Sequence, residues 1–361
     1  MPASAPPDRP VGAIPARHAL VVEEGVSLRM LNTLGLPAQA AHLVRVDSEA
    51  AVRRVVDHPQ WGMAPKMVLG GGSNLVFTRD PAALVIKVEV MGIRVVHEDT
   101  HAVIVEAGAG VGWHELVCWT LAHGLPGLEN MALIPGTLGA APVQNIGAYG
   151  VELKDRFHSL VAVDLVTGRT VELDARACAF GYRDSVFKQT GFGGLAGKSV
   201  ITRVRLRLPR PWQPIVGYLD LQRRIEDSGI TSPSPQQIFD WVCGIRRAKL
   251  PDPAVLGNAG SFFKNPVVSA EQCRDIIARD PGIVHYPLED GSVKLAAGWL
   301  IDACGWKGRS VGRAGVYDKQ ALVLVNRGGA TGAEVLTLAR AIQTSVYERF
   351  GIRLEPEPII I

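Results

Sequence analysis

The chain has 361 residues, of which 47% are hydrophobic and 20% are charged, and its formal net charge is +3. This length predicts two or three domains, and the composition is that of an ordinary soluble globular protein. The small net charge and the lack of a Lys/Arg block argue against a nucleic-acid-binding surface, and no apolar run approaches the length of a membrane span.

Residues 1–15 are rich in Pro and Ala and lack the apolar region of a signal peptide, so we predict a disordered tail. His97 and His101 have helical i, i+4 spacing but lie between two strand-like runs, so no metal site is expected. The five cysteines have no CxxC spacing, which is typical of reduced, mostly buried thiols in a cytosolic protein. They are Cys118, Cys178, Cys243, Cys273 and Cys304.

The first distinctive stretch is a glycine-rich loop, Gly70-Gly71-Gly72-Ser73-Asn74. It follows a predicted strand over Lys66–Leu69 and precedes another over 75–77. Such a loop can present its N–H groups to a phosphate. A Rossmann site is not expected, because no GxGxxG is present and no helix follows. A tight turn without a ligand is the alternative. Upstream, strand 41–46 leads into a helix that Asp47 or Ser48 caps.

The second distinctive stretch is Gly127–Gly150, whose glycines and prolines fit neither helix nor strand periodicity, although the segment is strongly apolar. A buried irregular segment must satisfy its backbone polar groups somewhere. A large cofactor with polar edges lying against it is one solution, and packing within the protein is the other. Before this stretch we predict strands over 84–90, 93–96 and 102–107, and a helix over 113–123 that stops at Gly124.

A polar cluster in an apolar frame follows a predicted hairpin, whose strands span 160–166 and 170–173. It covers 180–188 and includes Arg183, which could bind a carboxylate bidentately or pair with Asp184. A strand over 200–208 comes next. The Pro-rich run 209–214 then predicts a domain boundary.

The second half contains the stretch Gly257–Pro266, which combines two glycines, two asparagines, Ser261 and Lys264 around two phenylalanines. Taken alone it could be a turn or a ligand site. Around it, Ser234 with Pro235 predicts a helix to about Lys249. Capping patterns predict two more helices, one beginning after residue 269 and the other after residue 331. The second of these helices ends at residue 351. A strand over 321–325 is predicted between the two.

These stretches together resemble the UDP-N-acetylenolpyruvoylglucosamine reductases, flavoenzymes of bacterial peptidoglycan precursor synthesis. The resemblance runs from about Asn32 to Glu357, in seven blocks in the family's order. The resemblance is to the longer, type I form of the family, in which a tyrosine-bearing loop closes over the substrate. The blocks are Asn32–Leu36, Gly70–Leu75, Pro126–Leu153, Gly181–Lys188, Gly257–Val268, Gly291–Asp302 and Leu354–Glu357.

The resemblance implies an α+β fold: an FAD-binding domain of the vanillyl-alcohol-oxidase/p-cresol-methylhydroxylase type and a smaller α/β substrate-binding domain. We place the FAD-binding region at 16–211, with subdomains at about 16–80 and 81–211. The substrate domain is placed at 212–350, and a segment at 351–361 returns to the active site. The implied ligands are non-covalent FAD, NADPH and UDP-N-acetylglucosamine enolpyruvate. A cytoplasmic monomer is implied, without nucleic acid or membrane insertion.

The resemblance also implies site residues, which we expect at the positions of this chain that match the family's motifs. The catalytic residues would be Arg183, Ser261 and Glu357, and the substrate contacts would be Tyr182, Tyr218, Lys249 and Asn265. The FAD contacts would be Gly70, Gly71, Gly72, Ser73, Asn74, Ile134, Pro135, Gly136, Gly139, Gln144, Asn145 and Gly147.

The chemistry of enol-ether reduction explains these residue types. Hydride addition pushes negative charge onto the substrate carboxylate, which Arg183 and a protonated Glu357 would stabilise. Ser261 would donate the proton. The family tail has a basic residue two positions after the glutamate, whereas this chain has Ile359. The alternatives are another flavin oxidoreductase of the same fold, acting on a hydroxy acid or alcohol, or a non-catalytic nucleotide-sugar-binding protein.

Overall fold

The computed structural model describes residues 20–191 and 193–361, so the predicted tail at 1–15 lies outside the described residues. Within the described part, no helix is long and apolar enough to cross a membrane. In the same residues, no three His, Cys, Asp or Glu side chains gather where they could hold a metal ion.

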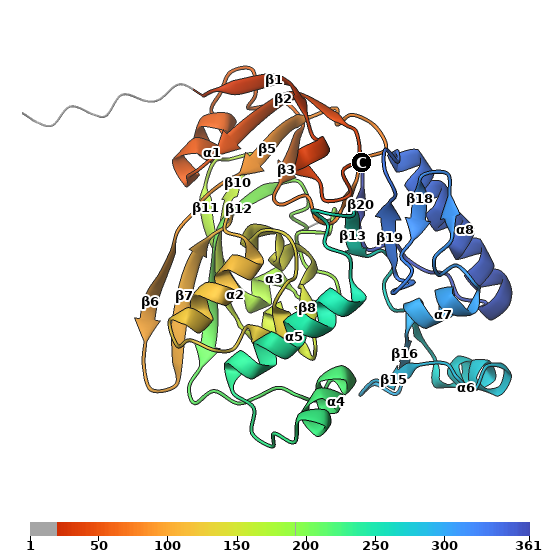
Figure 1. Ribbon diagram of the computed structural model, residues 1–361. Helices are drawn as coiled ribbons and strands as arrows, with labels where there is room; N and C mark the ends of the chain where they lie inside the picture. Colours follow the sequence, from red (N-terminus) through yellow and green to blue (C-terminus); the bar gives the residue numbers. More distant parts are fainter. Residues whose placement is uncertain (1–19, 192) are drawn as a thin grey trace, which may run out of the picture.

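The chain begins with a four-stranded sheet that carries the glycine-rich loop at one strand end (Figure 1). Its central strands are parallel, and the first strand is antiparallel to its neighbour. Ser48 caps the following helix α1 (Glu49–Val56) as predicted, because its side chain accepts a hydrogen bond from the N–H of Ala51. In sheet order the strands are β1 (Val22–Ser27), β2 (Gln39–Val46), β5 (Leu84–Val88) and β3 (Lys66–Leu69).

An antiparallel sheet of five strands lies beside the first, and the two share one hydrophobic core. The predicted hairpin is confirmed, with Val163 opposite Thr170. The helices α2 (Trp113–Ala122) and α5 (Pro235–Lys249) lie in front of this sheet in Figure 1, and α3 (Ala175–Cys178) follows the hairpin. In order the strands are β11 (Thr170–Asp174), β10 (Phe157–Asp164), β12 (Ser199–Pro209), β7 (Ala102–Gly108) and β6 (Ile93–Glu98).

A separate core forms around the second half of the chain. The long helix α8 (Gly332–Phe350) packs its apolar stripe into this core and begins with the predicted capping box between Thr331 and Glu334. Helices α6 (Ala270–Arg279) and α7 (Ala297–Ala303) complete it. The larger sheet has the order β13 (Asn258–Ser261), β19 (Val323–Asn326), β18 (Ala314–Val316), β17 (Ser310–Val311), and the smaller one β14 (Val267–Val268), β16 (Val293–Leu295), β15 (His285–Pro287).

Helix α5 belongs by packing to the first half of the molecule. Its buried side chains Ile238, Val242 and Ile245 join the core of the first two sheets, as does Leu221 from α4 (Leu219–Ser228). The boundary predicted at residue 212 stays a prediction, and this packing favours a later one, near the end of α5.

Two segments far apart in the sequence join the halves. Leu34 packs into the core of the second half, and its carbonyl oxygen accepts a hydrogen bond from the Asn326 side chain at 2.9 Å. In the other direction, strand β20 (Ile359–Ile360) returns to the first half and pairs in parallel with β4 (Leu75–Val76), directly after the glycine-rich loop. Figure 1 shows β20 beside β13, at the junction of the two halves.

Candidate active site

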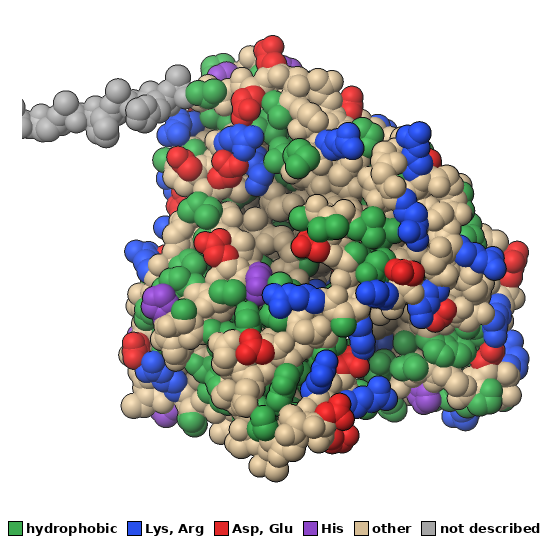
Figure 2. Space-filling model, in the orientation of Figure 1, with side chains coloured by type: hydrophobic (Ala, Val, Ile, Leu, Met, Phe, Trp, Pro, Cys, Tyr) green, Lys and Arg blue, Asp and Glu red, His purple; other side chains and the backbone are tan. Residues whose placement is uncertain are grey.

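A cavity of about 820 Å³ lies at the junction of the two halves. Figure 2 shows this face of the molecule hollowed near its centre. The cavity is lined by the glycine-rich loop, the Gly127–Gly150 stretch, strand β13 and the returning segment at 357–361. Among the described residues that line it, five side chains are basic and one, Glu357, is acidic. This charge balance favours an anionic ligand.

The glycine-rich loop packs against the Gly127–Gly150 stretch so closely that side chains would not fit. A Cβ added at Gly71 would lie 2.8 Å from the Cα of Gly136, and one added at Gly72 only 2.0 Å from the carbonyl oxygen of Leu31. Ser73 bridges the two loops, since its hydroxyl donates to the carbonyl of Pro135 at 3.3 Å. The glycines therefore build a two-loop wall of the cavity, and the expected contact of their N–H groups with a phosphate stays a prediction.

Three buried polar atoms beside the cavity have no hydrogen-bond partner within residues 20–191 and 193–361. They are Thr137 Oγ1, Ser199 Oγ and Arg246 Nε. Buried polar groups are nearly always hydrogen-bonded in native proteins. A large ligand with polar edges would satisfy them, and the volume, the basic lining and the glycine wall also fit FAD.

Ten of the twelve residues predicted to contact FAD line this cavity. Gly136 packs against Gly71 but is not in the cavity lining, and Asn145 is fully buried. The Asn145 amide donates to Glu152 and to the carbonyl of Gly181, and its oxygen accepts from the N–H of Lys154. Its side chain therefore supports the loops. The others are Gly70, Gly71, Gly72, Ser73, Asn74, Ile134, Pro135, Gly139, Gln144 and Gly147.

The structure brings Arg183 and Glu357 together, although 174 positions separate them (357 − 183). The Arg183 Nε lies 3.2 Å from Glu357 Oε1, and its Nη2 donates to the carbonyl of Gly147 at 3.2 Å. Arg183 has a φ of 54°, in the left-handed region that non-glycine residues rarely adopt. Lys188 supports this backbone because its Nζ donates to the Arg183 carbonyl at 3.2 Å.

Burial raises the pKa of Glu357, and this effect exceeds the opposing influence of Arg183, Lys188 and Lys264. The raised pKa matches the expectation that burial favours a protonated acid at this position. Its backbone is held on both sides: the Glu357 N–H donates to the carbonyl of Phe262, and its carbonyl accepts from the Asn74 side chain.

Ser261 is the last residue of β13 and lines the same cavity. The sequence suggested a loop here, but the stretch is an edge strand with an irregular register against β19. Gly260 at φ 68° provides this irregularity. The Ser261 side chain is exposed to the cavity, and among the described residues no hydrogen bond occupies its hydroxyl.

The four predicted substrate residues lie outside the cavity lining, in two pairs. The backbone N–H of Asn265 lies near the Tyr182 hydroxyl, and the Asn265 side chain accepts from the N–H of Ala297 at 3.0 Å. Lys249 forms an ion pair with Asp220 at 2.7 Å, and Tyr218 precedes the same helix α4. Tyr218 packs edge-on against Tyr149, with ring centroids 5.0 Å apart.

Sequence reasoning missed several residues that face the cavity. Thr137 and Ser199 were not singled out, and Arg246 lies in a helix where periodicity identifies only the apolar face. Lys188 was within a quoted block but received no role. No local signal distinguishes these side chains, since their importance comes from the tertiary arrangement.

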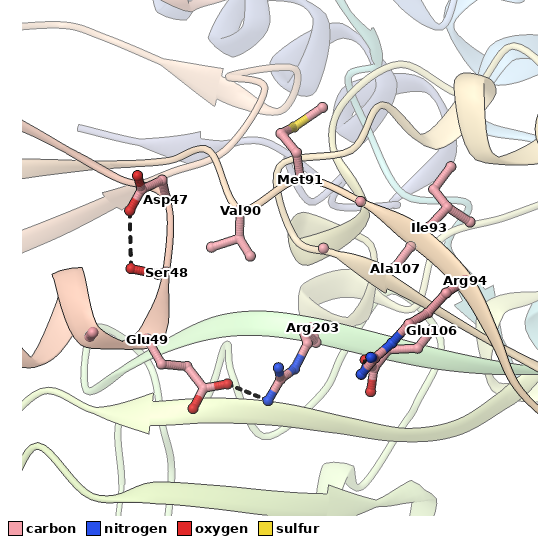
Figure 3. Close-up of a pocket in the computed structure, with 13 residues that line it drawn as sticks. Asp47, Ser48, Glu49, Val90, Met91, Ile93, Arg94, Glu106, Ala107 and Arg203 are labelled. Atoms are coloured by element: carbon pink, nitrogen blue, oxygen red, sulfur yellow. Dashed lines mark hydrogen bonds and ion pairs between the residues drawn. The ribbon is translucent and has the colours of Figure 1, made fainter. Parts of the chain in front are cut away.

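A second cavity, of about 580 Å³, lies between α1 and the sheet of β6 and β7 (Figure 3). Of the five charged side chains that line it, four are already paired with one another. Glu49 and Arg203 point toward each other and form an ion pair at 2.5 Å, and Arg94 binds Glu106 at 2.6 Å. We assign no ligand to this cavity.

Comparison with known proteins first gives the class: residues 40–174 match the family model described as FAD binding domain, so the chain is a flavin-binding protein. Residues 252–361 match the model described as UDP-N-acetylenolpyruvoylglucosamine reductase, C-terminal domain. The chain is 58% identical to the UDP-N-acetylenolpyruvoylglucosamine reductase of Burkholderia orbicola (strain MC0-3), over 91% of this chain and 94% of that protein. Identity to the Burkholderia vietnamiensis protein of the same name is 54%, over 99% of both chains.

A solved structure is also similar: the UDP-N-acetylenolpyruvylglucosamine reductase of Thermus caldophilus has a TM-score of 0.64 and 26% identity, covering 95% of this chain and 99% of that one. The chain belongs to the UDP-N-acetylenolpyruvoylglucosamine reductase family. The predicted fold class and the resemblance are both confirmed.

Proposed function

We propose that this protein is an NADPH-dependent flavoenzyme that reduces UDP-N-acetylglucosamine enolpyruvate to UDP-N-acetylmuramate in peptidoglycan precursor synthesis. Family membership supports the overall reaction. The observation that carries the residue assignment is the convergence of Arg183, Glu357 and Ser261 on one FAD-sized cavity. FAD bound there would supply the hydride for the methylene carbon of the enolpyruvyl group, and NADPH would replenish it.

Arg183 and Glu357 stabilise the charge that develops on the substrate. Hydride addition to the enol ether moves negative charge onto the carboxylate oxygens, and groups already fixed beside those oxygens lower the barrier most. The contact with Glu357 Oε1 and the bond to Gly147 hold the guanidinium in place. The raised pKa of Glu357 increases the fraction of this residue that can donate a hydrogen bond.

Ser261 donates the proton that completes the reduction at the neighbouring carbon. Its position supports this role, because Ser261 and Glu357 line the same cavity and the Glu357 N–H donates to the carbonyl of Phe262, the residue after Ser261. A serine is a weak acid, so the developing carbanion must be its direct partner.

The remaining assignments follow the family positions. Tyr182 and Asn265 form one substrate contact, and Tyr218 with Lys249 forms another beside helix α4.

NADPH and the nucleotide sugar use the site in turn. Initial-rate plots should therefore run parallel, and intersecting lines would contradict this scheme. We further propose a cytoplasmic monomer; five free cysteines are compatible with a reducing compartment.

The decisive experiment follows NADPH oxidation with UDP-N-acetylglucosamine enolpyruvate for the wild type, Ser261→Ala and the control Ser292→Ala. Ser292 lies in a turn outside the cavity lining. We expect Ser261→Ala to lose roughly 10²–10⁴ in rate and to keep bound FAD, while the control stays active. Full activity of Ser261→Ala would remove the proton-donor assignment, and a wild type that takes up no FAD would end the enzyme proposal.

A further inference from the structure

His114 joins three parts of the first half of the molecule, although the chemistry described so far gives it no role. It is the second residue of helix α2. Its ring stacks on that of Phe239 from α5, with ring centroids 5.7 Å apart and an angle of 6° between the planes. Its third contact is with the Gly127–Gly150 stretch, where the N–H of Leu133 donates to the imidazole Nδ1 at 3.1 Å. The ring therefore links two helices that lie side by side (Figure 1) to a stretch that lines the cavity.

Leu133 depends on this contact, because its backbone has a conformation that leucine rarely adopts. Its φ is 58°, in the left-handed region where the Cβ of an L-residue is crowded. Such a conformation persists only where the surrounding structure fixes it. Both backbone polar groups of Leu133 are fixed: its N–H donates to His114, and its carbonyl accepts from Nη2 of Arg246 at 3.2 Å. The turn leads directly into Ile134 and Pro135, the first residues of the stretch that line the cavity.

The hydrogen bonds of His114 define its protonation state. A backbone N–H can only donate, so Nδ1 carries no proton and the neutral ring has its proton on Nε2. Nε2 lies 3.7 Å from the Sγ of Cys118, whose thiol stays uncharged because burial raises its pKa. Burial, together with the positive charges of Arg247 and Arg246 on α5, lowers the pKa of His114 below its ordinary value of 6.5. A cation in the first turn of a helix also opposes the helix dipole. The imidazole is therefore neutral at pH 7, and protonation removes its acceptor.

We propose that His114 is a positioning residue for the cavity wall: its neutral ring holds the left-handed turn at Leu133 and so keeps the following residues in place to bind FAD. The inference rests on FAD binding in the proposed function and is independent of the residues assigned to the reduction. It makes the affinity for FAD depend on the charge of His114. When the pH falls far enough to protonate Nδ1, the N–H of Leu133 loses its acceptor and meets a cation instead. The turn then relaxes, and FAD binds more weakly.

The test measures the dissociation constant of FAD against pH for the wild type, His114→Phe and His114→Asn. The loaded, full-length protein is diluted serially, and released FAD is read from its fluorescence. Phenylalanine keeps a ring that can stack on Phe239 but offers no acceptor, whereas the Oδ1 of asparagine takes the place of Nδ1 and does not titrate. At about pH 8 we expect His114→Phe to bind FAD about 5- to 100-fold more weakly, because a donor left without a partner destabilises the turn. His114→Asn should keep most of the wild-type affinity.

The pH dependence separates positioning from a general structural role. For the wild type, the dissociation constant should be constant above pH 6.5, the ordinary histidine pKa, and should rise at lower pH. One proton changes it by at most about tenfold per pH unit. His114→Asn should lack this acid limb. The control is His123→Phe: His123 is an exposed residue at the carboxyl end of the same helix, stacks on Trp119 and lies outside the cavity lining. It should keep both the affinity and the acid limb of the wild type.

Equal affinities of His114→Phe and the wild type at about pH 8, or an acid limb that persists in His114→Asn, would overturn the proposal. If His114→Phe does not fold, the comparison of the wild type with His114→Asn decides, because the proposal requires the loss of the limb there as well. A wild type that shows the limb but does not reduce the enolpyruvyl substrate leaves this inference standing and removes the proposed function. Normal reduction without the limb removes only this inference.

Discussion

Replacing Glu357 by Gln tests the neutral acid at the centre of the proposed mechanism. The side chain is 10% exposed, and both of its backbone hydrogen bonds, to Phe262 and from Asn74, survive the change. The variant therefore keeps its position and loses only the titrating group. Removing one donor to a developing oxyanion typically costs about 10²–10³ in kcat, or about 2.7–4 kcal/mol. Because glutamine still offers an N–H donor, we expect the lower end of that range.

The pH dependence gives the sharper result. The pKa of Glu357 is raised above its ordinary value of 4.5, so the folded protein binds more protons than the unfolded chain between pH 4.5 and the raised pKa. Stability from this group is fully present below pH 4.5 and is lost as the pH rises through the folded pKa. The wild-type rate should fall over the same alkaline limb, and Glu357→Gln should lack both dependences.

The assay is the steady-state rate of NADPH oxidation against pH, alongside urea denaturation at matched pH values. Glu355→Gln is the control, because Glu355 lies two residues away, is 72% exposed and pairs with Lys264 at 3.1 Å. An alkaline limb that persists unchanged in Glu357→Gln, or that disappears in Glu355→Gln, would refute the assignment.

Three further results are expected. Lys188→Met should raise the pKa of Glu357 and move the alkaline limb upward, since Lys188 lowers that pKa; a downward shift in the pH–rate profile would contradict this. Gly71→Ala should abolish FAD retention on gel filtration, because its Cβ would lie 2.8 Å from the Cα of Gly136; a yellow variant would show that the loops can separate. Phe262→Ala should cost about 3–5 kcal/mol of unfolding free energy in urea, since the ring is fully buried.

Local sequence signals correctly predicted the helices whose ends are set by capping residues close by in the chain. Helix α5 begins as expected because Ser234 and Gln237 form a capping box with Pro235 at the first helical position, and it ends at Lys249 as predicted. The same reasoning predicted α8 and its stop at Gly351, which adopts φ 69°. The predicted ends of the two hairpin strands were less accurate, because those ends depend on the register with partner strands.

Contacts between distant segments could not be derived from local patterns. The pairing of β20 with β4 joins residues about 280 positions apart, and nothing in the composition of Ile359 or Leu75 specifies it. The position of Glu357 beside Arg183 was expected from family resemblance alone. Arg246 was not expected at all, because its surroundings come from α5, the Gly127–Gly150 stretch and β13 together.

The returning segment at 351–361 has a consequence for the making of the enzyme. Domains generally fold as units, with the N-terminal ones first during synthesis. The two sheets that share the first core can form while the ribosome is still translating α8, whereas Glu357 and the partner strand of β4 are translated afterwards. A nascent chain could thus acquire cofactor while lacking its catalytic acid, and the chemistry would begin only once these late residues have crossed back to the glycine-rich loop.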